Sequence, residues 1–188
     1  MQAAPVVATL RSHMPSLEVS RTEGVVGWRF WEVGETAEGW RLRSPYWSTV
    51  WATGEPLKAE CLGVQKELRA FARSHAAPGE SCRCGIYGGT YGQLQGFLRA
   101  NVAQYASVPV LGEVLLWGAV EQGSNGWRAS HAYPLALSVS TLSRRANDIA
   151  SALEAYAVPV EVLDAGETFS AVYAVRRGAD RHLTPLEE

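Results

Sequence analysis

The sequence lacks an uninterrupted hydrophobic run long enough to cross a membrane. Its longest apolar stretch, Val108 to Val120, contains Glu113 and is shorter than the roughly 20 residues that a spanning helix needs. The start of the chain also lacks the basic residues of a secretory leader, and Arg11 ends its short apolar run. We therefore expect a soluble protein of the cytoplasm that does not enter a membrane.

Cysteine and lysine are both scarce. The three cysteines, Cys61, Cys82 and Cys84, are an odd number, and a chain of 188 residues buries enough surface to fold without disulfides. Reduced thiols are therefore expected, as is usual in the cytoplasm. Only 2 lysines accompany 15 arginines, and the formal net charge is -2. The net charge therefore gives the chain no electrostatic attraction to nucleic acid or acidic membranes.

The sequence also lacks the compact motifs of several enzyme classes. It contains no Gly-x-Ser-x-Gly nucleophile elbow and no Gly-x-x-x-x-Gly-Lys phosphate loop. The neighbouring carboxylates, Glu32 with Glu35 and Glu113 with Glu121, are typical of solvated strand and loop positions. An enzyme is therefore the less favoured interpretation, although a metal-dependent hydrolase stays open as an alternative.

What is present is the composition of a globular protein, with 47% hydrophobic and 19% charged residues. Residues 1–22 combine proline and serine with few large apolar side chains, which indicates a tail or an edge element. The remaining length suits one hydrophobic core better than two. We expect residues 23–188 to form a single globular domain.

Runs of β-branched, aromatic and alternating apolar residues predict a sheet in this domain. The expected strands are 25–33, 40–43, 108–121, 127–133, 158–163 and 169–175. Short glycine-rich loops, such as 122–126, favour antiparallel hairpins over parallel crossovers. The predicted fold class is α/β in the broad sense and α+β more narrowly: a mostly antiparallel, tryptophan-rich sheet or small barrel with about three helices.

The helices are predicted from apolar residues that recur every three or four positions. The first covers 64–73, and the second carries its buried side from Leu94 to Tyr105. The third runs from Leu142 to Tyr156, with Ser140 or Thr141 as its N-cap. All three are expected to pack one apolar side on the sheet.

Cys61, His75, Cys82 and Cys84 are residue types that bind zinc. A helix over 64–73 is about 15 Å long, so Cys61 and His75 at its two ends are not expected to reach one ion. His75 can approach Cys82 and Cys84 across the next turn, provided that the Cys-x-Cys backbone is turned and not extended. We therefore predict one structural zinc bound by His75, Cys82, Cys84 and one further group. The more favoured alternative is a set of reduced, buried thiols beside a histidine at a helix end.

Tryptophan is abundant, with seven residues in the chain and five of them between positions 28 and 51. Arginines are interleaved with these indoles, and the two types together form stacking and cation-π surfaces. The expected partner-binding residues are Trp28, Arg29, Arg41, Arg43, Trp47 and Trp51. The alternative is a tryptophan-rich core with arginines on its outside.

Two short motifs occur in order along the chain, Cys82-Arg83-Cys84-Gly85-Ile86-Tyr87 and Gly126-Trp127-Arg128-Ala129, followed by Ala132-Tyr133-Pro134. In this order they resemble a group of uncharacterised small soluble proteins of actinobacterial type. The likeness spans roughly Val25 to Leu137. It implies a soluble bacterial protein with no known activity, so it carries over no catalytic residue.

These observations favour a binding protein over an enzyme. The leading hypothesis is a non-enzymatic accessory or regulatory protein that recognises a protein partner. A module for single-stranded nucleic acid is the first alternative, because indoles and arginines also stack on bases. The net charge of -2 and the scarcity of lysine favour the protein partner.

Overall fold

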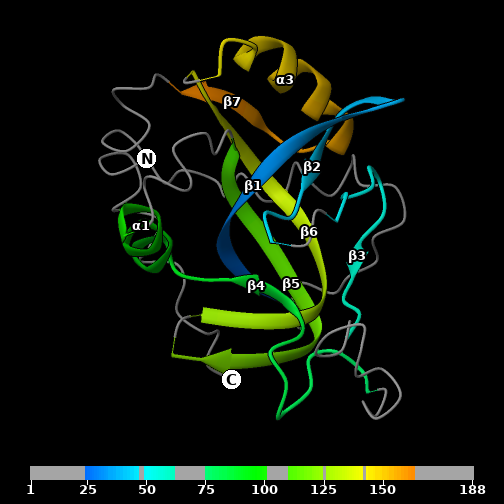
Figure 1. Cartoon of the computed structure of the whole chain (residues 1–188), viewed down its shortest axis with the longest axis vertical. Helices are drawn as coiled ribbons and strands as arrows, with labels where there is room; N and C mark the ends of the chain where they lie inside the picture. The colour runs from blue at the N-terminus through cyan, green and yellow to red at the C-terminus, as the bar shows by residue number, and fades with distance from the viewer. Residues whose placement is uncertain are drawn as a thin grey trace, which may run out of the picture.

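The computed structural model describes residues 24–46, 49–61, 75–100, 110–124, 126–141 and 143–163. The expected tail at 1–22, helix at 64–73 and strand at 169–175 lie outside these residues. Within them the chain forms seven strands and two α-helices (Figure 1).

The strands form one sheet. They are β1 (Val25–Thr36), β2 (Gly39–Arg43), β3 (Leu57–Lys58), β4 (Ile86–Gly88), β5 (Val110–Gly123), β6 (Gly126–Ser140) and β7 (Val160–Leu163). The order along the sheet is β2-β1-β5-β6-β3, and β4 and β7 also pair with β6. Each of these pairings is antiparallel except that of β6 with β7. The mostly antiparallel α+β sheet is thus confirmed, whereas this open strand order does not confirm a small barrel.

The β5-β6 hairpin is the longest unit of the sheet. Val110, Val114 and Leu116 of β5 are fully buried, because alternate side chains of a strand point to the same face. At the turn Gly126 has φ +112, and a Cβ there would collide with the carbonyl oxygen of Gly88. Glycine is therefore required where β4 crosses this end of the hairpin.

Three short strands occupy the edge of β6 that β5 does not use. β4 pairs with 127–129, β3 with 131–132 and β7 with 137–140. β3 and β4 therefore lie end to end along β6, although they come from separate parts of the chain. This arrangement brings the residues that follow β3 close to those that precede β4.

The two helices are α1 (Tyr91–Ala100) and α3 (Ala146–Leu153), and a 3-10 turn, η5 (Glu154–Tyr156), continues α3. Thr90 and Gln93 exchange side-chain hydrogen bonds with each other's backbone N–H, which is a capping box at the start of α1. α3 begins at Ala146, after the predicted start at Leu142, and the N–H of Ala146 closes a turn by donating to Ser143 O at 3.1 Å. Three helices are not confirmed, and in the described part of the chain neither helix is long and apolar enough to span a membrane.

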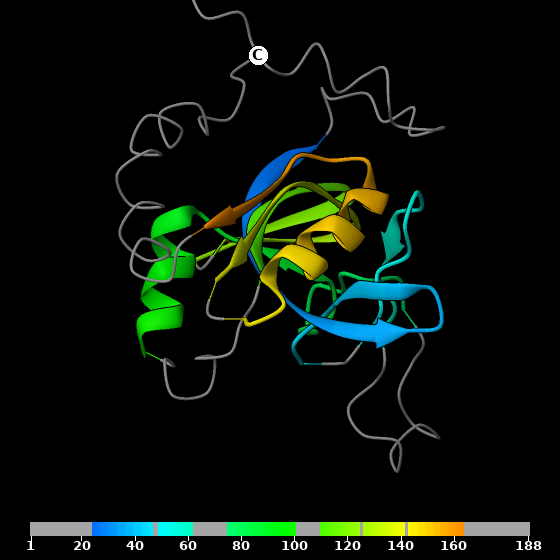
Figure 2. The ribbon, with the colours of Figure 1, turned by 90° about the horizontal axis from the view of Figure 1, so that it is seen from above.

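The two α-helices pack against opposite faces of the sheet, α1 on β1 and α3 on β2, β6 and β7. Trp28 and Phe30 belong to a buried cluster with Tyr91 and Leu94 of α1. Trp31, which points the other way, belongs to the main core, as do the buried residues of α3. Figure 2 shows α1 and α3 on different sides of the strands. Both faces of this part of the sheet are therefore covered.

Candidate metal centre

Four side chains of metal-ligand type meet where β3 ends and β4 begins. Cys61 follows β3, and His75, Cys82 and Cys84 precede β4. One ligand atom from each residue lies within 4.8 Å of the other three. Cys61 Sγ is 3.7 Å from Cys82 Sγ, and His75 Nε2 is 3.3 Å from Cys84 Sγ. The four residues are close enough to hold one metal ion.

The expectation that Cys61 stays apart from the other three residues is wrong. It depended on a straight helix over 64–73, which lies outside the described residues. The fold brings Cys61 to the site through strand pairing: Ala59 donates its backbone N–H to Ser130 O at 2.7 Å, while Ile86 pairs with Ala129. Neighbouring positions of β6 therefore hold the two chain segments together.

The segment that carries Cys82 and Cys84 is turned, as a shared metal requires. The backbone N–H of Cys82 donates to Gly79 O at 2.9 Å, and the N–H of Gly79 donates to Cys84 Sγ at 3.3 Å. The His75 ring packs directly on Gly79, where a Cβ would lie 2.5 Å from His75 Nε2. A glycine at 79 thus leaves the space that the imidazole needs to reach the thiols.

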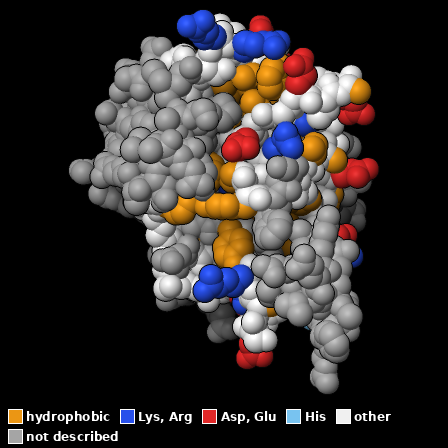
Figure 3. Space-filling view, viewed as in Figure 1, with side chains coloured by type: hydrophobic (Ala, Val, Ile, Leu, Met, Phe, Trp, Pro, Cys, Tyr) orange, Lys and Arg blue, Asp and Glu red, His pale blue; other side chains and the backbone are white. Residues whose placement is uncertain are grey.

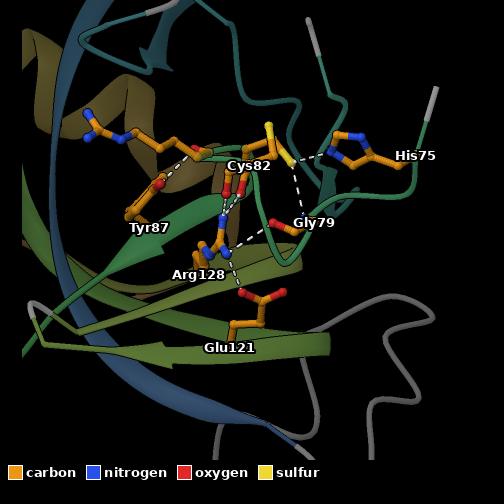
Figure 4. Close-up of polar contacts among 8 residues, drawn as sticks. His75, Gly79, Cys82, Tyr87, Glu121 and Arg128 are labelled. Atoms are coloured by element: carbon orange, nitrogen blue, oxygen red, sulfur yellow. Dashed lines mark hydrogen bonds and ion pairs between the residues drawn. The ribbon is translucent and has the colours of Figure 1, made fainter. Parts of the chain in front are cut away.

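Arg128 of β6 fastens this turn to the β5-β6 hairpin (Figure 4). Its guanidinium donates to Cys82 O, to Cys84 O at 3.3 Å and to Gly79 O at 3.1 Å, and it forms an ion pair with Glu121. Each of these contacts uses a backbone carbonyl or a carboxylate, so the sulfur atoms remain available to a metal. Sequence reasoning missed this role of Arg128, and its place in the second motif is the only signal that pointed to it.

The thiols differ in their acidity. A hydrogen bond from the backbone N–H of Cys84, together with the Cys84 side chain, lowers the pKa of Cys82 to about 7. Burial raises the pKa of Cys84, although the Gly79 N–H opposes this effect. Cys82 therefore loses its proton more readily than an ordinary thiol.

A shallow cavity of about 300 Å³ borders the candidate metal centre. It lies between the cysteine-bearing turn and the end of the β5-β6 hairpin. Its lining consists of Cys82, Arg83, Tyr87, Glu121, Gln122, Gly123, Ser124, Gly126, Trp127 and Arg128. Tyr87 is 47% exposed and donates its hydroxyl to Arg83 O at 2.6 Å. We call this cavity the hairpin groove.

Two of the predicted partner-binding indoles are buried. Trp28 and Trp51 are 3% and 1% exposed, which agrees with the tryptophan-rich core that the sequence also indicates. Trp28 packs edge-on against Tyr91, and Trp51 against Trp31. Large aromatic rings gain more from burial than other side chains, and both faces of β1 are covered, so neither orientation leaves an indole outside. Trp47 lies outside the described residues.

The predicted arginines are also engaged within the fold. Arg29 donates to Tyr87 O at 2.6 Å and lies over the Trp51 ring, and burial lowers its pKa to about 10. Arg41 forms an ion pair with Glu38 at 3.3 Å, and the Arg43 side chain lies across Gly34. On the face shown in Figure 3, the visible basic side chains lie in separate places and not in one continuous area.

Comparisons with known proteins identify no relative: no family model, no curated protein and no solved structure matches the chain.

Proposed function

We propose that this chain is a non-enzymatic binding module that is stabilised by one zinc ion and recognises a protein partner. The observation that carries the proposal is the meeting of Cys61, His75, Cys82 and Cys84. Three thiolates and one imidazole are a donor set that proteins use for structural zinc.

The distances support zinc in particular. With Zn–S bonds of about 2.3 Å and a Zn–N bond of about 2.0 Å, a regular tetrahedron has S–S edges of about 3.8 Å and S–N edges of about 3.5 Å. The corresponding distances are 3.7 Å from Cys61 Sγ to Cys82 Sγ and 3.3 Å from His75 Nε2 to Cys84 Sγ. Small movements are enough to complete the coordination shell.

The ligand count favours a structural role for this zinc. Four protein ligands fill a tetrahedral shell, whereas a catalytic zinc keeps one position for water or substrate. The outer contacts fit the same role, because the Gly79 N–H and Arg128 hold the turn in place. The metal-dependent hydrolase is therefore not favoured.

Native mass spectrometry of the full chain tests the metal. One zinc per chain is expected, and His75→Ala should weaken zinc binding. His131→Ala is the matched control, because His131 stacks on Trp117 and is not one of the four clustered residues. A wild-type protein that binds no zinc, or equal zinc affinity in both variants, would contradict the proposal.

The hairpin groove is the surface that we assign to the protein partner. Its walls present Tyr87, Trp127 and the exposed Arg83, and aromatic and arginine side chains contribute most of the energy in protein interfaces. One wall is the turn that contains Cys82, so zinc would hold the groove in shape. An extended segment with an acidic side chain complements Arg83 at the rim.

Peptide selection tests this assignment. Peptides selected from a random displayed library on the zinc-loaded protein should lose affinity by about tenfold or more in Tyr87→Ala. Val162→Ala is the control, because Val162 is also exposed but lies on β7 at the other end of β6. Equal affinities in the two variants, or a library that yields no binder, would refute the groove assignment.

The nucleic-acid alternative loses its main support, because Trp28 and Trp51 lie in the core. A gel-shift series with single-stranded DNA and RNA at about 50 mM and about 200 mM salt decides between the classes. Salt-sensitive micromolar binding would reverse our ranking, and no binding at either salt agrees with it.

A further inference from the structure

We infer that the candidate metal centre is also an oxidation site: a two-electron oxidant of the peroxide class joins Cys61 and Cys82 in a disulfide and releases the metal. The release rests on the proposed zinc, whereas the choice of cysteine pair rests on the positions of the side chains.

The contacts of the sulfur atoms favour this pair. Cys61 Sγ and Cys82 Sγ are in contact at 3.7 Å, and the two residues belong to different segments that β6 holds side by side. Cys84 Sγ also interacts with both other thiols, but its contacts with His75 Nε2 and the N–H of Gly79, both at 3.3 Å, hold it toward these two residues. A disulfide between Cys82 and Cys84 would close a small ring across one residue, which disfavours the dihedral angle that disulfides prefer.

The site is accessible to a small oxidant. His75 is exposed, and the three cysteines are partly exposed. Cys82 also lines the hairpin groove, which opens to solvent. The sulfur atoms therefore lie at the surface of the domain and not within its core.

The chemistry balances with hydrogen peroxide as the named oxidant. One thiolate attacks a peroxide oxygen, the O–O bond breaks, and a sulfenic acid and hydroxide form. The second thiolate attacks the sulfenic sulfur, the S–O bond breaks, and a second hydroxide leaves as the S–S bond forms. Two thiolates lose two electrons to the peroxide, and the metal loses two of its four ligands.

The remaining contacts predict that the fold survives oxidation. Arg128 holds the turn through the carbonyl oxygens of Gly79, Cys82 and Cys84, and none of these is consumed. The new covalent bond links the same two segments that the metal linked. Reduction by a thiol should therefore restore the zinc-binding state.

The experiment follows zinc and disulfides together in the full zinc-loaded chain. Zinc content before oxidant tests the proposed function; hydrogen peroxide is then added while a metallochromic dye reports released zinc. The expected result is one zinc released per chain, a mass loss of about 2 Da from two hydrogens, and a Cys61–Cys82 link in a peptide map. Dithiothreitol should reverse all three changes.

Specific outcomes would overturn the inference. These are zinc that stays bound under peroxide, a dominant link to Cys84, or irreversible sulfinic acid as the main product. Cys84→Ser should still form the Cys61–Cys82 link, and Cys61→Ser should not form it. The peptide map of the wild-type chain identifies the linked cysteines even if either variant misfolds. A wild-type chain that binds no zinc but still forms the Cys61–Cys82 link would contradict the proposed zinc and support the choice of cysteine pair.

Discussion

Gly79→Ala is the sharpest perturbation of the candidate metal centre. The added methyl would lie 2.5 Å from His75 Nε2, closer than real Cβ contacts occur, so the imidazole must move away. The φ of Gly79 is not positive, so alanine fits the backbone. The hydrogen bonds of Gly79 use its N–H and C=O, which alanine also has. The substitution therefore acts on the position of one ligand.

The expected magnitude follows from that single displacement. Changes that misplace a metal ligand through its surroundings reduce affinity by about 10–100-fold. This corresponds to about 1.4–2.8 kcal/mol of binding free energy. Because His75 is exposed, its ring has room to swing outward, so we expect weaker zinc binding without loss of the fold.

Competition with a chromophoric chelator measures the zinc affinity, and circular dichroism checks the fold. Gly92→Ala is the matched control, because a Cβ at Gly92 meets nothing within 4 Å, and its zinc affinity should equal that of wild type. If Gly79→Ala binds zinc as tightly as Gly92→Ala, His75 is not a ligand in the arrangement described above.

Three further substitutions test the outer contacts and the core. Arg128→Ala should weaken zinc binding by about 10–100-fold, since three turn carbonyls lose their donor; calorimetric titration measures it, and an unchanged affinity would count against this role. Tyr156→Phe should lower the free energy of unfolding in urea by about 1–3 kcal/mol, because the buried hydroxyl donates to Trp51 O at 2.6 Å and accepts from Leu42 N at 3.0 Å. Burial raises the pKa of Tyr156 from 10.0 to about 12, so the unfolded chain loses the Tyr156 proton at a lower pH than the folded chain. The free energy of unfolding should therefore fall as pH rises from 10 to 12, and it should fall less in Tyr156→Phe. Leu153→Ala should cost about 2–5 kcal/mol because Leu153 is fully buried, and an unchanged melting temperature would reject that placement.

The sheet could be predicted where its signal is local. β5 and the start of β6 carry alternating apolar residues on either side of a glycine-rich turn, and both strands form there. The sequence predicts that the strand starting at Trp127 ends at Tyr133, but β6 continues through Pro134 to Ser140. The pairing shifts register where Pro134 lies opposite Val114, and a proline is tolerated at such a bulge.

The metal centre could be predicted in part. His75, Cys82 and Cys84 are close in sequence, so a turn was enough to unite them. The sequence does not predict the position of Cys61, because its approach depends on two distant strand pairings with β6, which no local pattern indicates. The burial of Trp28 and Trp51 could not be predicted for a related reason: alternation gives the two faces of β1, but not that both faces are covered.

The crowded edge of β6 has a consequence for aggregation. A strand of 15 residues with an open edge is a template on which another chain can pair. β4, β3 and β7 have three, two and four residues, so each is too short to offer a long template of its own. Cys61 follows β3, and Cys82 and Cys84 precede β4, so the candidate metal centre lies at the ends of two of these short strands. A variant in which β3 and β4 no longer pair with β6 would expose residues 127–132 of that strand, and it should self-associate through strand pairing.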